Sequence, residues 1–171
     1  RVYNQADLEA IDTAKYYRVM NDITLSGWQS YTNLSGMIYG NDSNVTLKFT
    51  NGSQAFVNNL SGTIKDLTFV GEMTANGGAS AGFIANEVGE DGLIESCAID
   101  VYYENIASEY YESRLISYAT QRTGAVAGLN YGTIRNVFVY GASINAQSTF
   151  VGGIVGENNG LIEGTGFEFY R

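Results

Sequence analysis

The chain has 171 residues, of which 44% are apolar, and it contains 21 glycines, 13 tyrosines and no proline. This length and apolar content predict a single globular domain with a buried core. The formal net charge of −9 argues against nucleic acid as a partner, because an acidic surface repels phosphate. No apolar run reaches the roughly 18–20 residues of a membrane helix, so membrane insertion is not expected.

Residues 1–50 are predicted to form an N-terminal cap and an atypical first coil. Residues 5–14 (QADLEAIDTA) predict a short helix with Leu8 and Ile11 facing inward, and Trp28 is expected to pack within the cap. Residues 17–25 predict a strand, and residues 37–39 and 45–49 predict strands around a turn. A capped end is expected because an open sheet edge invites aggregation.

Four segments of the remaining chain, residues 53–171, align with one another. Each has Gly-x-Ile at its centre, and the isoleucines are separated by 30, 40 and 28 residues: Ile64, Ile94, Ile134 and Ile162. Three further apolar columns repeat: Phe56, Phe83, Val126 and Ile154; Leu67, Cys97, Val137 and Thr165; Phe69, Ile99, Val139 and Phe167. Apolar residues fall three and five positions after each isoleucine, with Thr165 as the one weak member. Since strand residues alternate faces with period two, the step of three requires a bend.

Repeated coils of this kind bury their apolar faces by stacking on one another. The chain is therefore predicted to be all-β, a right-handed single-stranded parallel β-helix (β-solenoid) with a short N-terminal capping helix. The glycines at positions 62, 92, 132 and 160 are expected to serve turns, where they tolerate left-handed backbone angles. A sandwich of antiparallel strands is the alternative fold.

The longest step contains an inserted loop, residues 102–122. Insertions in a solenoid map to its surface, often to the binding face, and exposed tyrosines supply contact area for protein or sugar. The candidate partner-binding residues are Tyr102, Tyr103, Tyr110, Tyr111, Arg114 and Tyr118. The alternative is a short helix or hairpin that packs its tyrosines onto the flank of the solenoid.

Residues 123–141 (TGAVAGLNYGTIRNVFVYG) and 151–164 (VGGIVGENNGLIEG) resemble the GLUG repeat of bacterial surface and secreted proteins. The opening DLEAI and YRVMNDI segments and the turn Gly-Asn-Asp at residue 40 are similar to the lead-in of the same β-helices. Such coils occur in adhesin-like proteins and in the N-terminal region of streptococcal-type immunoglobulin A metallopeptidases.

The resemblance implies an extracellular location at the bacterial cell surface. It implies a non-catalytic structural or adhesive module that binds a host protein or glycan. The alternative is a substrate-holding N-terminal domain of a secreted IgA-type metallopeptidase. The chain is expected to be part of a larger polypeptide that continues at both ends, and its last coil is expected to be completed or covered by a further segment.

Catalytic chemistry is mostly excluded because the chain has no histidine. His-Glu-x-x-His zinc sites, Ser-His-Asp triads and Cys-His pairs are therefore impossible within it. The single cysteine, Cys97, lies in an apolar column and is expected to be a buried, inert thiol.

The carboxylates suggest no catalytic pair. Asp66, Glu95 and Glu163 occupy near-equivalent outward positions beside Arg135, which predicts a solvated charge ladder rather than a glycosidase site. A polysaccharide-active enzyme is therefore the least favoured function. No catalytic residue, cofactor or metal is predicted. Calcium at residues 41–44 is the alternative to ordinary Asx turns there.

Overall fold

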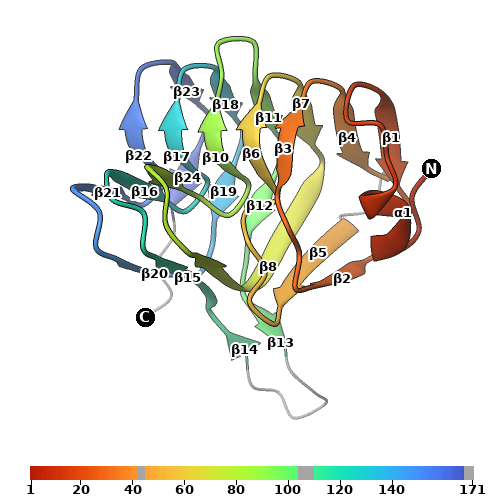
Figure 1. Ribbon diagram of the computed structural model, residues 1–171, viewed down its shortest axis with the longest axis horizontal. Coiled ribbons are helices and arrows are strands. Elements are labelled where there is room, and N and C mark those ends of the chain that lie inside the picture. Colours follow the sequence, from red (N-terminus) through yellow and green to blue (C-terminus); the bar gives the residue numbers. More distant parts are fainter. Residues whose placement is uncertain (42–44, 104–109, 168–171) are drawn as a thin grey trace.

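The computed structural model describes residues 1–41, 45–103 and 110–167. Short strands wind around one apolar core and build four parallel sheets, which we number in the order in which a coil visits them (Figure 1). Sheet I contains β3 (Tyr31–Leu34), β6 (Val57–Leu60), β10 (Ala85–Val88), β17 (Ala127–Asn130) and β22 (Val155–Asn158). Sheet II contains β1 (Tyr16–Val19), β4 (Met37–Gly40), β7 (Thr63–Lys65), β11 (Leu93–Glu95), β18 (Thr133–Arg135) and β23 (Leu161–Glu163).

Sheets III and IV complete the walls. Sheet III contains β2 (Ile23–Ser26), β5 (Val45–Thr50), β8 (Leu67–Ala75), β12 (Ala98–Ile99), β19 (Phe138–Val139) and β24 (Gly166–Phe167), together with β15 (Ser113–Ser117) and β20 (Ala142–Ala146). Sheet IV contains β9 (Ser80–Ala81), β16 (Arg122–Gly124) and β21 (Phe150–Gly152). All pairings within these sheets are parallel, as in the pairs β7–β11 and β10–β17, which confirms the predicted parallel β-helix and rules out the antiparallel sandwich.

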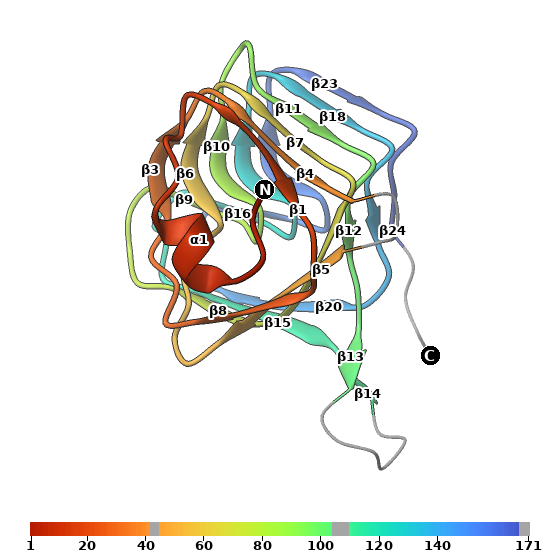
Figure 2. The same cartoon turned by 90° about the vertical axis from the view of Figure 1, so that its right-hand side faces the viewer.

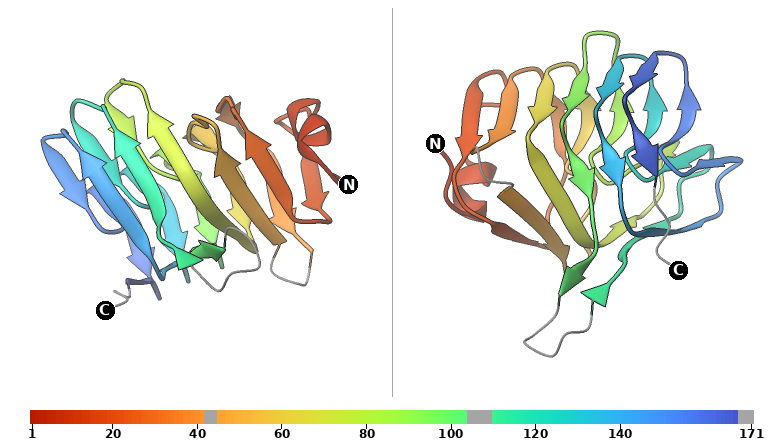
Figure 3. Two further views of the ribbon diagram at one scale, coloured as in Figure 1. Left: turned by 90° about the horizontal axis from the view of Figure 1, so that it is seen from below. Right: turned by 180° about the vertical axis from the view of Figure 1, so that it is seen from behind.

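The helix is right-handed. Seen from the N-terminal end, the chain passes from β6 on the left through β7 at the upper right to β8 at the bottom as the coils recede (Figure 2). The coils follow one another along the axis from red at the N-terminal end to blue at the C-terminal end (Figure 3).

The strand register reproduces the isoleucine column of the sequence. Ile64 pairs with Ile94, Ile94 with Ile134, and Ile134 with Ile162. The column also continues one coil earlier, because Ile38 pairs with Ile64. The stacked isoleucines line the core, where the members before Ile162 are fully buried.

The bend expected after each isoleucine is present at one repeated corner. Asp66, Ser96 and Asn136 have φ angles of 56°, 52° and 51°, and Gly164 has 56°. This left-handed conformation costs little for glycine, asparagine and aspartate. The corner turns the chain from sheet II into sheet III, so alternation starts afresh in the next strand.

The glycine of each Gly-x-Ile is required for a reason other than turn geometry. Gly62 and its equivalents in the column lie outside the left-handed region. A β-carbon on Gly62 would instead lie 2.0 Å from the carbonyl oxygen of Gly36, in the preceding coil. The expected role in left-handed turns is therefore wrong, and these glycines are needed because successive coils approach each other closely.

The N-terminal end of the solenoid is capped by α1 (Gln5–Glu9). Leu8 is fully buried, and the Gln5 side chain accepts from the backbone nitrogen of Ser26 (2.8 Å) at the edge of β2. The helix is shorter than predicted because Asp12 begins a turn, accepting from the backbone nitrogen of Ala14 (3.1 Å). Trp28 is buried in the cap region, as expected.

A further difference from the predicted elements lies near the N-terminal end. The single strand predicted over residues 17–25 is wrong, because the chain turns a corner there: Val19 pairs with Gly40 in sheet II and Ile23 with Leu47 in sheet III.

In the last coil, Ile162 is only half-buried and Leu161 is 47% exposed. Among the described residues, no helix is long and apolar enough to span a membrane.

Candidate functional site

The predicted insertion is divided by the structure into a hairpin and regular coil. β13 (Tyr102–Tyr103) and β14 (Tyr110–Tyr111) pair antiparallel and project from the solenoid wall (Figures 1 and 2). The next strand, β15, returns to sheet III, where Leu115 pairs with Met73 and with Ile144. The segment that leaves the wall therefore lies between Asp100 and Ser113, and the rest of residues 102–122 belongs to the coil.

Ser113 closes the base of this hairpin. Its hydroxyl donates to the carbonyl oxygen of Asp100, on the other side of the hairpin, and accepts from the backbone nitrogen of Gly71 (3.0 Å), in the coil below. The Ser113 side chain is fully buried. The hairpin thus starts and ends at one fixed point of the wall.

The predicted tyrosines do not form one exposed cluster. Tyr102 is only 8% exposed; its ring packs against Tyr111, with centroids 5.8 Å apart, and lies 4.7 Å from the ammonium nitrogen of Lys48. Tyr111 is 43% exposed and Tyr118 is 52% exposed. The alternative in which a hairpin packs a tyrosine onto the flank therefore holds for Tyr102. The side chains of Tyr103 and Tyr110 lie outside the described part of the chain.

Arg114 is held on the wall by an ion pair. Its guanidinium lies 2.9 Å from the Glu72 carboxylate, and both side chains are about half exposed to solvent. Arg114 comes from β15 and Glu72 from the neighbouring strand β8, so the pair joins successive coils. The structure thus brings Tyr102 and Tyr111 together in the hairpin and places Arg114 and Tyr118 on the regular coil.

A groove lies beside the hairpin, on the outer face of sheet III. One hollow of about 420 Å³ has walls formed by these residues: Asp22, Ile23, Thr24, Thr46, Lys48, Thr68, Val70, Asp100, Val101 and Tyr102. A second hollow of about 370 Å³ meets it at Thr68 and Asp100 and extends to Phe138 and Tyr140. We call the two hollows together the sheet III groove.

The chemistry of the sheet III groove is mixed. Threonine hydroxyls, carboxylates and the Lys48 ammonium offer both donors and acceptors. At the far end the rings of Phe138 and Tyr140 stack, with centroids 5.8 Å apart, and Phe138 is 40% exposed. Thr46, Thr68, Ala98 and Phe138 are paired in turn on successive strands of sheet III, so the groove follows the axis of the solenoid and changes from polar to aromatic along it.

Sequence reasoning missed most of this groove. Its members are separated by one coil each and do not form a local motif. The signal lay in the positions that alternate with the buried columns, as Thr46 and Thr68 do with Leu47 and Phe69. Reading those outward positions across coils would have found it.

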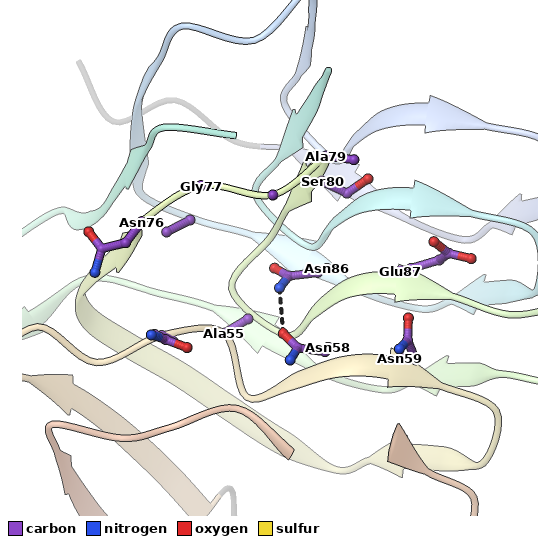
Figure 4. A pocket seen from close by; sticks show the side chains of 12 residues that line it. Ala55, Asn58, Asn59, Asn76, Gly77, Ala79, Ser80, Asn86 and Glu87 are labelled. Atoms are coloured by element: carbon purple, nitrogen blue, oxygen red, sulfur yellow. Dashed lines mark hydrogen bonds between the residues drawn. The ribbon is translucent and has the colours of Figure 1, made fainter. Parts of the chain in front are cut away.

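A second groove of about 470 Å³ lies on the outer face of sheet I, beneath the segment that leads into β9 (Figure 4). Asn58, Asn59 and Asn86 line it from the sheet. Asn86 donates to Asn58 (2.7 Å), while the Oδ1 atom of Asn86 is buried and has no hydrogen-bond partner among the described residues. Leaving such an acceptor unpaired costs about 1–3 kcal/mol.

The outward carboxylates form a charge ladder with a register different from the expected one. Lys65, rather than Asp66, is level with Glu95, because Asp66 occupies the corner. Arg135 lies 2.5 Å from Glu163 and 3.5 Å from Glu95. The ladder therefore alternates in sign along the axis, and its acidic members are neutralised by their neighbours.

Cys97 is buried, as predicted from its column. Burial raises the pKa of its thiol to about 12. In the part of the chain that the structure describes, no group of three or more metal-ligating side chains comes together. Of the candidate calcium turn at residues 41–44, residues 42–44 lie outside the described residues.

No protein-family model matches the sequence, and neither the curated proteins nor the solved structures contain a match to it.

Proposed function

We propose that the chain is a non-catalytic binding module of an extracellular bacterial surface protein, and that it holds a glycan in the sheet III groove. One observation carries the proposal: a hollow lined by hydroxyl, carboxylate and ammonium groups meets, at Thr68 and Asp100, a second hollow that is lined by the exposed aromatic ring of Phe138. The resemblance of residues 123–141 and 151–164 to GLUG repeats supports the location.

A sugar ring presents hydroxyls that both donate and accept, together with apolar C–H faces. Threonine hydroxyls can do both, carboxylates only accept and the Lys48 ammonium only donates, so the groove can match several hydroxyls at once. The exposed face of Phe138 supplies the apolar contact. Each hollow falls within the range of about 300–1,000 Å³ that is typical of ligand sites.

The groove also has the periodicity that a chain-like ligand requires. Thr46, Thr68 and Ala98 are paired across successive strands, and Ala98 is paired in turn with Phe138. Coils of a parallel sheet repeat at about 4.8 Å. A sugar chain lying along the axis would therefore meet an equivalent position at every coil.

The test is a glycan array followed by calorimetry with the glycans that bind. Thr68→Val keeps the shape and removes a hydroxyl, and Phe138→Ala removes the platform; each should weaken binding about tenfold, a loss of about 1.4 kcal/mol. Thr63→Val, on sheet II and outside the groove, is the matched control and should bind like the wild type.

Two outcomes would oppose the proposal. A glycan whose affinity is unchanged in both groove variants would not be bound there. Capture of a host protein that is lost in Tyr111→Ala but kept in Thr68→Val would assign the binding function to the exposed hairpin instead.

A further inference from the structure

Sheet IV starts with β9, because the preceding coil contributes no strand to it, so one edge of β9 is unpaired. Two backbone bonds fix the preceding coil to the coil of β9: Thr74 donates to Ser53 (2.9 Å) and Phe56 donates to the oxygen of Phe83 (3.0 Å). Between these points the preceding coil has residues 54 and 55, whereas the coil of β9 has residues 75–82. The longer segment bows outward to make β9, and only later coils follow it with β16 and β21.

The free edge presents backbone hydrogen-bonding groups. Ser80 pairs with Arg122, and the Arg122 backbone nitrogen donates to the oxygen of Ala79 (2.9 Å). In a parallel ladder, neighbouring residues direct their N–H and C=O groups to opposite sides. The Ser80 groups therefore face away from β16, toward the preceding coil, and no hydrogen bond joins Ser80 to that coil among the described residues.

The space beneath this edge is the amide-lined groove of Figure 4. Gln54, Asn58, Asn59 and Asn86 line it opposite the segment that carries Gly77 and Ser80. Side-chain amides offer the same N–H and C=O groups as a peptide bond. None of the lining residues is aromatic, in contrast to the sheet III groove, so the amide groove lacks a platform for sugar rings.

We infer that this groove takes an extended peptide segment of a partner protein, which adds to β9 as one more strand of sheet IV. Strand addition supplies main-chain hydrogen bonds from the edge and leaves specificity to the pockets for alternate side chains. Glu87 is the only charged residue of the lining, and the chain carries a net charge of −9, so the fitting peptide is neutral or basic.

The probe is a phage-displayed library of random heptapeptides selected on the full chain, followed by synthesis of the recovered peptide. Ser80→Pro removes the N–H that faces the groove, and an edge strand tolerates proline where the ladder does not use that N–H. Its affinity should fall at least about tenfold, with thermal unfolding close to that of the wild type.

A second pair of variants keeps the test decisive if Ser80→Pro fails to fold. Gln54→Ala removes a side chain that lines the groove and should weaken binding several-fold. The control is Gln29→Ala, which removes an exposed glutamine one coil before Gln54. Gln29 does not line the groove, so this variant should bind like the wild type.

Strand pairing can also be tested on the backbone of the peptide. β9 comprises only Ser80 and Ala81, and of these Ser80 alone directs its N–H and C=O groups into the groove, so methylation of the one peptide nitrogen that donates to Ser80 should abolish binding and methylation of its two neighbours should not. The inference is overturned if no peptide is recovered, if Ser80→Pro and Gln54→Ala bind like the wild type, or if N-methylation weakens binding equally at every position.

Discussion

The carbonyl oxygen of Gly132 lies 2.2 Å from the position that a β-carbon on Gly160 would occupy. A β-carbon on Gly132 would likewise lie 2.3 Å from the oxygen of Gly92, and one on Gly92 would lie 2.4 Å from the oxygen of Leu60, so coil-to-coil packing leaves room for hydrogen alone at this point. The isoleucine two residues later can stack without a gap because the glycine before it comes so close.

Gly132→Ala should therefore destabilise the fold strongly. The new methyl group would meet the oxygens of Gly92 (2.3 Å) and Gly89 (2.4 Å), and backbone atoms cannot yield as a flexible side chain would. We expect a loss of about 3 kcal/mol in the free energy of unfolding, measured by urea denaturation. Gly89→Ala, whose methyl group would have one contact at 3.4 Å, is the control and should cost far less. Equal costs for the two variants would contradict the close-approach explanation.

Tyr31→Phe should weaken the N-terminal cap and remove part of its alkaline sensitivity. The Tyr31 hydroxyl donates to the backbone oxygen of Leu8 (2.6 Å), and losing this bond should cost about 1–2 kcal/mol. Burial, assisted by the charge of Glu9, raises the pKa of the Tyr31 phenol above its ordinary value. The folded state therefore keeps a proton that the unfolded state releases above about pH 10.

This linkage makes the contribution of Tyr31 to stability fall as the pH rises above about 10. Melting curves of the wild type and of Tyr31→Phe should therefore stay apart below about pH 10 and converge above it. Tyr16→Phe, at a side chain that is 75% exposed, should show no such convergence. Parallel curves for the wild type and Tyr31→Phe would show that Tyr31 ionises equally in both states.

Glu157→Gln should remove an acid-sensitive part of the stability. The Arg122 guanidinium, which donates to Glu157, and the Asn159 amide (3.0 Å) lower the pKa of the Glu157 carboxyl. A carboxyl whose pKa is lower in the folded chain stabilises the fold at any pH above its pKa in the unfolded chain, which is about 4.3. This stabilisation is lost as the pH falls through the pKa of the folded chain. The wild type should therefore exceed Glu157→Gln in melting temperature at pH 6, and the difference should shrink toward pH 3. A constant difference would argue against the ion pair as its source.

Cys97 should resist thiol reagents in the folded chain. With a pKa of about 12, only about one thiol in ten thousand is ionised at pH 8, and the sulfur is also inaccessible. Labelling with a maleimide should be negligible without denaturant and rapid in urea. Tyr118→Cys, at an exposed position, should label at once in the folded state. Rapid labelling of the wild type at Cys97 would show that the coil opens easily there.

Much of the fold is predictable because a stacked coil imposes its period on the sequence. The spacing of Ile64, Ile94, Ile134 and Ile162 predicts the register that the strands adopt. The coil of Ile38 carries the same Gly-x-Ile signal at Gly36, but its other apolar positions do not match the columns of the later coils. The corner near residue 21 could not be located in the same way, because it has no glycine and no residue with a left-handed backbone conformation.

Sheet IV and the grooves are not predictable in the same way. The strand β9 is only Ser80–Ala81, within a stretch of small residues that shows no alternation of apolar and polar positions. The groove beneath it exists because the coil of β9 is longer than the coil before it. This difference in length can be measured only when the backbone bonds of Thr74 and Phe83 to the preceding coil are known. The hairpin could be located as a break in the period, but its end at Ser113 depends on the pairing of β15.

Because Ser113 closes the hairpin at its base, the length of the hairpin does not affect how the coils of the solenoid pair with one another. Its two ends meet at one buried hydroxyl, and the strands on either side keep the pairing that they have in the next coil, as Ile99 does with Val139. We therefore expect that residues added or exchanged between Tyr103 and Tyr110 leave the pairing of the neighbouring coils unchanged. In this sense the hairpin is a place where new recognition sequences can be inserted while the stacked coils keep their register.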